Sequence, residues 1–591
     1  MTPRVTGGRR LASAAAVVGI CVLLAPLSSR AQDVASPEAA TGRTVAQGDA
    51  QGALAKSYMV AAANPIAAAA GAEIIKAGGN AIDAAIAVQL VLNMVEPQSS
   101  GIGGGAFLVY WDAKKKKLTT FDGRERAPAA ANEKRFLTAD GQPMARLTAI
   151  VGGRSVGVPG VVRMLELAHH KHGKLPWANL FAPAIRVADE GFPVSQRLHD
   201  LLAVDPALRN SEPARSYYYQ SDGTPLAVGT VLRNPELAVV LRAIAAKGSD
   251  AFYKGAVAAD IVRTVTTAQS NPGDITLKDL KSYHAAERKP VCGPYRAYLV
   301  CGMGAPSAGG IGVIQTLRLI ERFNLRALGA TSATAYHVLA EAGRLALADR
   351  AVYIADPDAI RVPTDALIAP DYLRGRSQLI NLDRRMNTVE AGKVPLRGAF
   401  NLVPAQSPEL PSTSHMSIVD RDGNAVAMTT SVENAFGSRL MVDGFILNNT
   451  LTDFSYDDVA KGNTVANRGG ANKRPRSSMA PTMVFNSQGR LEMVLGSPGG
   501  PAIVAFVAKT LVAMIDWGTT PQEAVATPNA LDFGNGLMIE PALEPAKAVF
   551  EALGDTVTVG EFPSGLQVIR ITPDGLEGGA DPRREGVAIG E

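Results

Sequence analysis

Apolar and polar residues recur along this chain with two different periods. Several stretches of ten or more residues are apolar along one face or all round, as helices are when they pack against a core. Short apolar runs of the length of β-strands lie between them, often bounded by glycine or proline. This alternation predicts a mixed α/β architecture. The predicted helices are residues 66–76, 81–94, 161–172, 175–185, 234–247, 311–322, 333–355 and 502–515, and the predicted strands are 57–63, 107–112, 295–303 and 491–495.

A β-hairpin is predicted over residues 412–432. In its first half, from Ser412 to Val419, hydroxyl side chains alternate with apolar ones, which is typical of a half-buried strand. The segment from Asp420 to Asn424 has the composition of a tight turn. A three-residue loop with Gly423 in the left-handed conformation is a common hairpin connection, and it would pair residue 420 with residue 424.

This register places two hydroxyl groups side by side. It sets Thr413 opposite Ser431, and the strand period of two puts Glu433 further along the same face. A two-residue loop would destroy the arrangement, because a slip of one residue turns every side chain to the other face. Paired strand hydroxyls can also be no more than cross-strand stabilisation, so the hairpin alone does not define a site.

Two local motifs that suggest ligands are better explained as structure. Gly101, Gly103 and Ala106 imitate a dinucleotide fingerprint, but that motif follows a strand and opens a helix, whereas here a predicted helix precedes it and a predicted strand follows. The run from His169 to His172 has no acidic or cysteine partner placed by the sequence, so we interpret it as the exposed end of a helix. The sequence therefore implies no metal ion and no organic cofactor.

Composition indicates a large globular protein. The chain has 591 residues, 47% hydrophobic and 19% charged, too many for one ordinary core and too apolar for a disordered chain. Its formal charge of +4 is misleading, because the first 32 residues hold four arginines and no acid. The other 55 of the 59 basic residues equal the 55 acidic ones. This balance gives no reason to expect nucleic acid or an anionic membrane as a partner.

Residues 1–31 have the features of a secretory signal. Three arginines precede an apolar run at residues 11–27, and Ser29-Arg30-Ala31 is a small-x-small cleavage site. A membrane anchor is the alternative, but the apolar run is short for a span and no second one follows. We expect the segment to be removed after export across the inner membrane, and the mature protein to reside in the periplasm without membrane attachment.

The cysteines leave one question open. Cys21 would leave with the signal, so the mature chain keeps Cys292 and Cys301, which flank a short hairpin-like run. In an oxidising compartment these two residues could form a disulfide. Free buried thiols are an equal alternative, because the spacing does not establish the geometry of a bond.

Several segments along the chain resemble one family in their order and spacing. The matching segments are residues 78–85, 96–107, 121–128, 305–310, 411–420, 448–454, 472–482, 496–500 and 578–586. Together they resemble the γ-glutamyltransferase family (γ-glutamyltranspeptidase, glutathione hydrolase) over its whole precursor. That family belongs to the N-terminal nucleophile hydrolases, which cut themselves just before a threonine. Thr413 matches that threonine.

The resemblance implies the fold and the processing of the chain. The expected fold is a four-layer αββα sandwich formed jointly by two fragments of one precursor. Cleavage before Thr413 would give a large fragment, residues 32–412, and a small fragment, residues 413–591, which stay together as a heterodimer. The alternation of strands and helices in the sequence agrees with this class of fold.

The resemblance also implies roles for individual residues. Arg124 matches an arginine that holds the α-carboxylate of the substrate, a task that suits its bidentate fork; an ion pair with Asp122 or Glu125 is the structural alternative. Asp453 matches the acid that holds the α-ammonium group. The other matches are Ser477 and Ser478 beside the α-carboxylate, the N–H groups of Gly499 and Gly500 as oxyanion donors, Ser431 near the nucleophile, and Glu433 where members carry Asn or Glu.

Three further positions qualify this picture. Thr450 stands where many members have Glu or Gln in contact with the amino group. We therefore expect a weaker contact between the protein and the ammonium group of the substrate. The loop at residues 455–471 is shorter than the lid of some members and offers only Tyr456 at its start, so we do not assume a lid. His415 is expected to pack or hydrogen-bond locally rather than to act as a base.

The expected chemistry follows from the hydroxyl of Thr413. A threonine hydroxyl needs a base within hydrogen-bond reach, and a free α-amino group, with a pKa of about 7.7–8.0, can be that base. Thr413 carries such a group only after its bond to Ser412 is broken. It would then accept the γ-glutamyl group of glutathione or a related compound and pass it to water, an amino acid or a peptide. Two glycine N–H groups can approach the oxyanion closely.

Two other functions remain as alternatives. An acylase of the same fold would cleave a glutaryl or cephalosporin-type amide, whose acyl group lacks the α-ammonium. Asp453 and Glu433 favour a γ-glutamyl substrate, because two anions suit a cation. The second alternative is a non-catalytic periplasmic binding protein, against which the retention of Thr413, Ser477 and Ser478 argues.

Overall fold

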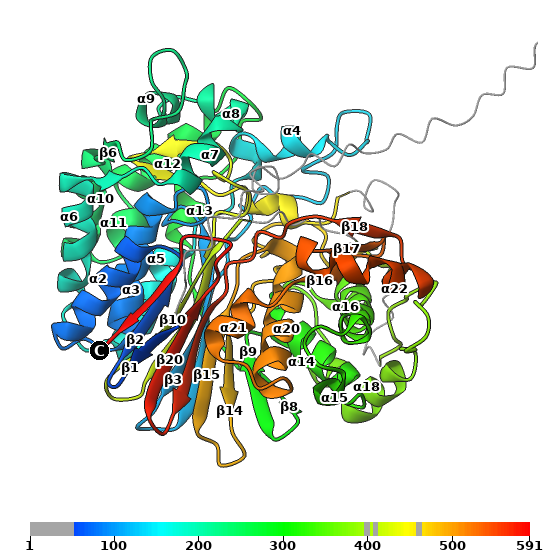
Figure 1. The fold of residues 1–591 in the computed structure, drawn as a ribbon. Coiled ribbons are helices and arrows are strands. Elements are labelled where there is room, and N and C mark those ends of the chain that lie inside the picture. The colour runs from blue at the N-terminus through cyan, green and yellow to red at the C-terminus, as the bar shows by residue number, and fades with distance from the viewer. Residues whose placement is uncertain (1–51, 395–401, 406–411, 457–463) are drawn as a thin grey trace, which may run out of the picture. The chain divides into compact units, whose positions relative to one another are not determined.

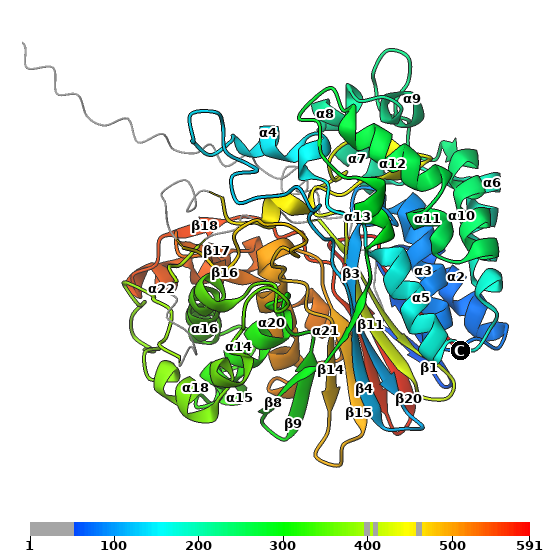
Figure 2. The ribbon, with the colours of Figure 1, turned by 180° about the vertical axis from the view of Figure 1, so that it is seen from behind.

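The computed structural model describes residues 52–394, 402–405, 412–456 and 464–591. Two seven-stranded β-sheets lie face to face in the centre, and helices cover the outer face of each (Figure 1). The view from behind shows the same four layers (Figure 2). The predicted αββα class is therefore confirmed. The predicted signal at residues 1–31 lies outside the described residues.

Each sheet combines strands from both sides of Thr413. The first sheet has the order β1 (Ala53–Ala55), β20 (Gly575–Ala580), β19 (Gln567–Thr572), β15 (Leu491–Gly496), β14 (Thr482–Phe485), β9 (Tyr298–Gly302) and β8 (Val291–Tyr295). The second has the order β21 (Val587–Gly590), β2 (Met59–Ala62), β10 (Ser414–Val419), β11 (Ala425–Ser431), β3 (Gly105–Asp112), β4 (Lys117–Gly123) and β7 (Ala286–Arg288). Neither half of the sequence therefore holds a complete sheet.

The helices fall into two groups, one on each outer face (Figure 1). On the second sheet lie α2 (Pro65–Lys76), α3 (Ala81–Val95), α5 (Val161–His172), α6 (Ala182–Glu190) and α10 (Pro235–Lys247), and on the first lie α14 (Gly309–Ile320), α16 (Ala333–Tyr353), α20 (Ile503–Ile515) and α21 (Pro521–Ala526). Shorter elements include α4 (Arg146–Ile150), α7 (Gln196–Ala203), α8 (Pro206–Arg209), α9 (Ala214–Tyr218), α11 (Asp250–Tyr253), α12 (Ala256–Thr266), α13 (Leu277–Lys281), α15 (Leu325–Leu328), α17 (Thr364–Leu367), α18 (Pro370–Ser377) and α22 (Lys547–Ala552). No helix in the described part of the chain combines the length and apolarity that a membrane span requires.

The β10–β11 hairpin has the predicted register. Ser414 pairs with Thr430, the N–H of Asp420 donates to the carbonyl of Asn424 at 2.9 Å, and Gly423 has a φ of 78°. The three-residue loop and its left-handed glycine are therefore confirmed. The turn lies at one end of the hairpin. The first residue of β10 and the last residue of β11 lie at the opposite, open end.

Alternate side chains of the hairpin pack into different layers. Met416 and Ile418 belong to the core shared with α2 and α3, whereas Val419 and Ala427 belong to the core between the two sheets. Every residue of β10 is buried. The prediction of a half-buried strand is therefore wrong, because helices cover one face of the strand and a second sheet covers the other.

The histidine run at the end of α5 also differs from its prediction. The ring of His169 packs against Trp177, and its Nε2 lies 2.9 Å from the carbonyl oxygen of Leu175. An exposed helix end describes His170 but not His169, whose side chain is only 12% exposed. In the part of the chain that the structure describes, no group of three His, Cys, Asp or Glu side chains could hold a metal ion.

Cys292 and Cys301 form a disulfide across the β8–β9 hairpin, so of the two alternatives the structure has the bonded one. The bond closes a loop with a sequence separation of 9, for which loop entropy predicts about 2–3 kcal/mol of stabilisation. We expect the double variant Cys292→Ser, Cys301→Ser to melt at a lower temperature than the wild type. A reductant should lower the melting temperature of the wild type and leave the variant unchanged. Equal melting of all samples would show that strand pairing alone holds the hairpin.

Candidate active site

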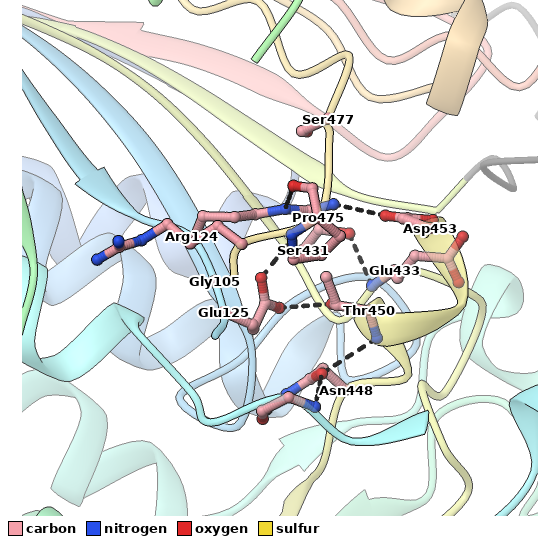
Figure 3. A network of polar contacts seen from close by, with 12 residues as sticks. Gly105, Arg124, Glu125, Ser431, Glu433, Asn448, Thr450, Asp453, Pro475 and Ser477 are labelled. Atoms are coloured by element: carbon pink, nitrogen blue, oxygen red, sulfur yellow. Dashed lines mark hydrogen bonds and ion pairs between the residues drawn. The ribbon is translucent and has the colours of Figure 1, made fainter. Parts of the chain in front are cut away.

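A small pocket lies at the open end of the β10–β11 hairpin. It gathers side chains from segments far apart in the sequence, and Figure 3 shows several of these residues from close by. The lining residues are Arg124, Thr413, Ser431, Glu433, Asp453, Ser477, Met479, Gly500 and Ile503. Most of the residues singled out in the sequence thus meet in one space.

Thr413 precedes β10 and lies opposite Ser431, the last residue of β11. The hydroxyl of Thr413 donates to Oγ of Ser431 over 3.1 Å, and the same oxygen accepts the N–H of Glu433 at 2.9 Å. The carboxylate of Glu433 accepts a hydrogen bond from the amide of Asn449. Since Thr413 and Ser431 are each only 3% exposed, the threonine hydroxyl is held in one orientation within a largely water-free setting.

Arg124 follows β4, and fixed acceptors surround its guanidinium (Figure 3). Its Nε donates to the carbonyl of Pro475 at 3.1 Å, and its Nη2 donates to the carbonyl of Arg476 at 2.8 Å. Nη2 also lies 2.5 Å from Oδ2 of Asp453, while Nη1 lies 3.5 Å from Oε2 of Glu125. The structural ion pair with Glu125 therefore exists together with the contact to Asp453. The pocket wall presents a cation and an anion side by side.

Thr450 lies behind this wall rather than in the pocket. It is fully buried, and its hydroxyl donates to Oε1 of Glu125 at 2.7 Å. Its N–H donates to Oδ1 of Asn448 at 3.1 Å. Burial raises the pKa of Glu125, and the charge of Arg124 acts in the opposite direction. Thr450 thus orients the carboxylate that accompanies Arg124, a supporting position that the sequence did not indicate.

Ser477 lines the pocket and is held by the turn that precedes α14. Its N–H donates to the carbonyl of Pro306 at 3.1 Å, and its carbonyl accepts the N–H of Ala308 at 2.8 Å. Ser478, next in the chain, does not line the pocket but is 1% exposed. The hydroxyl of Ser478 makes no hydrogen bond to any residue within the described ranges.

Gly499 and Gly500 connect β15 to the turn that opens α20. They have φ values of 131° and 56°, which side chains disfavour. A Cβ at Gly499 would also lie 2.5 Å from the ring of Phe506. The N–H groups of both glycines have no acceptor among the described residues, and they sit at the N-terminal end of α20, where the helix dipole favours negative charge.

His415, two residues after Thr413, is enclosed between the two sheets. Its Nδ1 lies 2.8 Å from Oγ1 of Thr429 and its Nε2 lies 3.1 Å from Oγ of Ser417. Burial lowers the pKa of His415 to about 3. The prediction that it hydrogen-bonds locally is therefore confirmed, and the ring stays neutral near pH 7.

The buried neutral ring makes stability depend on pH. Between a pKa of about 6.5 in the unfolded chain and about 3 in the folded chain, the unfolded state binds a proton that the folded state does not. Acidification therefore favours unfolding, by about 1.4 kcal/mol per pH unit below pH 6.5. Between pH 7 and pH 5, the free energy of unfolding should fall by about 2 kcal/mol less in His415→Gln than in the wild type, as measured by urea unfolding at both pH values. Equal losses would contradict a neutral, buried ring.

Two lining residues were missed by reasoning from the sequence. Met479 and Ile503 contribute apolar side chains to the pocket. Met479 lies inside the matching segment 472–482, directly after Ser478, and Ile503 lies in the predicted helix 502–515, shortly after Gly500. Their position in the chain was thus a usable signal, but their side chains carry no reactive group that draws attention.

The arrangement suits one kind of chemistry. Thr413 and Gly500 line the same pocket, and Gly499 directly precedes Gly500. A fixed hydroxyl together with backbone N–H groups that can stabilise an oxyanion suits acyl transfer through a tetrahedral intermediate. The adjacent guanidinium and carboxylates suit an acyl group that carries both a negative and a positive charge.

Known proteins that resemble this chain include enzymes and a solved acylase. A sequence model of the family described as gamma-glutamyltranspeptidase matches residues 67–591. The glutathione hydrolase proenzyme of Bacillus subtilis is 40% identical over 481 residues, 80% of either chain. That of Escherichia coli is 36% identical over 546 residues, 90% of this chain and 91% of its own. The cephalosporin acylase from Bacillus halodurans superposes with a TM-score of 0.79 at 27% identity, covering 92% of this chain and 97% of that one.

Proposed function

The chain belongs to the γ-glutamyltranspeptidase family, and we propose that Thr413 cuts its own bond to Ser412 and then acts as the nucleophile of a γ-glutamyltransferase and glutathione hydrolase. As a member of this family, the chain is an enzyme of the transferase and hydrolase type. The donor is glutathione or another γ-glutamyl compound. Thr413 takes the γ-glutamyl group as an ester, which water, an amino acid or a peptide then receives.

The main support for the proposed substrate class is one observation: the ion pair of Arg124 and Asp453 lies in the same pocket as Thr413. The α-carbon of a γ-glutamyl group carries one carboxylate and one ammonium. Arg124 would bind the carboxylate, with help from Ser477 and Ser478, and Asp453 would bind the ammonium.

Glu433 supports the ammonium side of this proposal. Its carboxylate lines the pocket and is oriented by Asn449, so two anions face the place where the substrate's cation would lie. Thr450 acts indirectly, through Glu125. The N–H groups of Gly499 and Gly500 receive the oxyanion, and Ser431 holds the hydroxyl of Thr413.

The cut before Thr413 divides the chain without separating its parts. The large fragment, residues 32–412, and the small fragment, residues 413–591, contribute strands to both sheets, so they stay together as a heterodimer after the peptide bond is broken. Residues 1–31 direct export, and the mature enzyme works in the periplasm.

A same-fold acylase is the second candidate, because the cephalosporin acylase from Bacillus halodurans shares the architecture. Two matched substrates separate the two functions: γ-glutamyl-p-nitroanilide and glutaryl-p-nitroanilide differ only in the α-ammonium group. We expect the first to be cleaved with a kcat/KM at least about 30-fold higher, since leaving one partner of a buried charge pair without its counterpart costs about 2–5 kcal/mol. Release of glutamate from glutathione then tests the natural donor. A preference for the glutaryl compound would replace the transferase by an acylase.

A further inference from the structure

Arg584 lies in the turn that crosses from one sheet to the other. This turn, residues 581–586, connects β20 of the first sheet to β21 of the second. The side chain of Arg584 is buried, and its Nη1 donates to the carbonyl oxygen of Thr413 at 2.8 Å. Its Nε and Nη2 donate to the carbonyl oxygen of Pro563 at 3.1 and 2.8 Å. Since Thr413 leads into the second sheet and Pro563 precedes a strand of the first, one guanidinium ties the two sheets together at the candidate nucleophile.

The same side chain packs toward the candidate oxyanion donors. A Cβ added to Gly565 would lie 2.7 Å from Cδ of Arg584 and 2.7 Å from Cγ of Pro498, so only a glycine fits between them. Pro498 directly precedes Gly499. Arg584 and Pro498 therefore pack on either side of Gly565, which couples the position of Arg584 to the loop that contributes Gly500 to the pocket.

The backbone of Thr413 is strained where Arg584 holds it. Its φ is 149°, in a region that residues with a side chain rarely adopt. Arg584 anchors the carbonyl on one side of this residue. On the other side, the hydroxyl of Ser412 donates to the carbonyl of Gln98 at 2.7 Å. The bond between Ser412 and Thr413 thus lies between two anchored groups, which hold Thr413 in this unusual φ next to that bond.

We propose that Arg584 is a positioning residue for self-cleavage, holding the strained Thr413 of one sheet in register with the loop of Pro498 to Gly500 on the other. This inference rests on the proposed use of Thr413. In the cleavage, Oγ of Thr413 bonds to the carbonyl carbon of Ser412, the C–N bond between the two residues breaks, and the hydroxyl proton ends on the released amine. Water then hydrolyses the ester, which leaves a carboxylic acid on Ser412 and restores the hydroxyl.

The test follows cleavage of the newly folded chain by intact mass over time. Arg584→Ala should be cut at least about 100-fold more slowly than the wild type, because small misplacements of reacting groups cost about this much. Arg584→Lys should also be slow, since one ammonium cannot reach both carbonyls at once. Methylguanidinium should accelerate Arg584→Ala. Arg570→Ala is the matched control: it removes an arginine of the same C-terminal segment that pairs with Glu577, and it should be cut at the wild-type rate.

Gly565→Ala tests the same step without removing the guanidinium. Its new Cβ must displace Arg584 or Pro498, so cleavage should slow and methylguanidinium should not help. Thermal melting shows which variants are folded. A folded Arg584→Ala that is cut at the wild-type rate would overturn the proposal, as would slow cutting that methylguanidinium leaves unchanged. If Arg584→Ala does not fold, cleavage of Arg584→Lys at the wild-type rate would overturn the proposal instead. A wild-type chain that stays uncut before Thr413 contradicts the proposed function instead.

Discussion

Replacing Thr413 by alanine should leave a single uncut chain with no measurable transfer or hydrolysis of γ-glutamyl compounds. The hydroxyl that attacks the bond to Ser412 and the hydroxyl that accepts the acyl group are the same atom, so one substitution removes both steps. Loss of a nucleophile of this kind lowers the rate by at least about 10⁴-fold. Intact mass of the purified wild type should show two fragments, the smaller beginning at Thr413, and that of the variant should show one chain.

Two further variants make this result specific. Thr413→Ser keeps a hydroxyl and should still be cut, at a reduced rate. Thr430→Ala removes a buried threonine of the same hairpin that faces the other layer, where its hydroxyl is 3.4 Å from the carbonyl of Gly105, and it should be cut normally. An intact wild-type chain under conditions that keep it folded would reject the mechanism and favour a binding protein. Cleavage of Thr413→Ala would show that another residue is the nucleophile.

Replacing Asp453 by asparagine should reduce kcat/KM for γ-glutamyl-p-nitroanilide by about 30-fold or more, because loss of one partner of a buried charge pair costs about 2–5 kcal/mol. The asparagine has nearly the same shape but no charge for the substrate's ammonium. The reduction for glutaryl-p-nitroanilide should be much smaller, since that compound has no ammonium to bind. The ratio of the two kcat/KM values therefore measures the contact itself.

The ratio also distinguishes a direct contact between Asp453 and the substrate from an indirect effect of Asp453 through Arg124. Asp453 lies 2.5 Å from Nη2 of Arg124, so the variant could act by displacing the arginine, which both substrates need for their carboxylate. Equal reductions for both substrates would indicate this indirect role and contradict an ammonium contact. Asp422→Asn, on the exposed tip of the hairpin, is the matched control and should change neither value.

Whether a structural feature could be predicted from the sequence depends on how far apart in the chain the interacting residues lie. The register of β10 and β11 depends on one short turn and on alternating side chains, so the pairing of Ser414 with Thr430 could be predicted. The cap of α3 by Asn80 and Asp83 is local in the same way. The burial of β10 on both faces could not be predicted, because the strands that cover the second face, β15 and β19, lie far from β10 in the chain.

The candidate site shows the same division. The sequence by itself determined the mixed α/β class, the hairpin that sets Thr413 beside Ser431, and, through resemblance, which other residues to consider. Only the tertiary structure decided that Arg124 meets Asp453, 329 positions further along, that Thr450 supports Glu125 from behind, and that Arg584 joins Thr413 to Pro563. The reason is physical: turns and strand periods act between neighbours in the chain, whereas these contacts exist only once two sheets, each built from distant segments, have packed against each other.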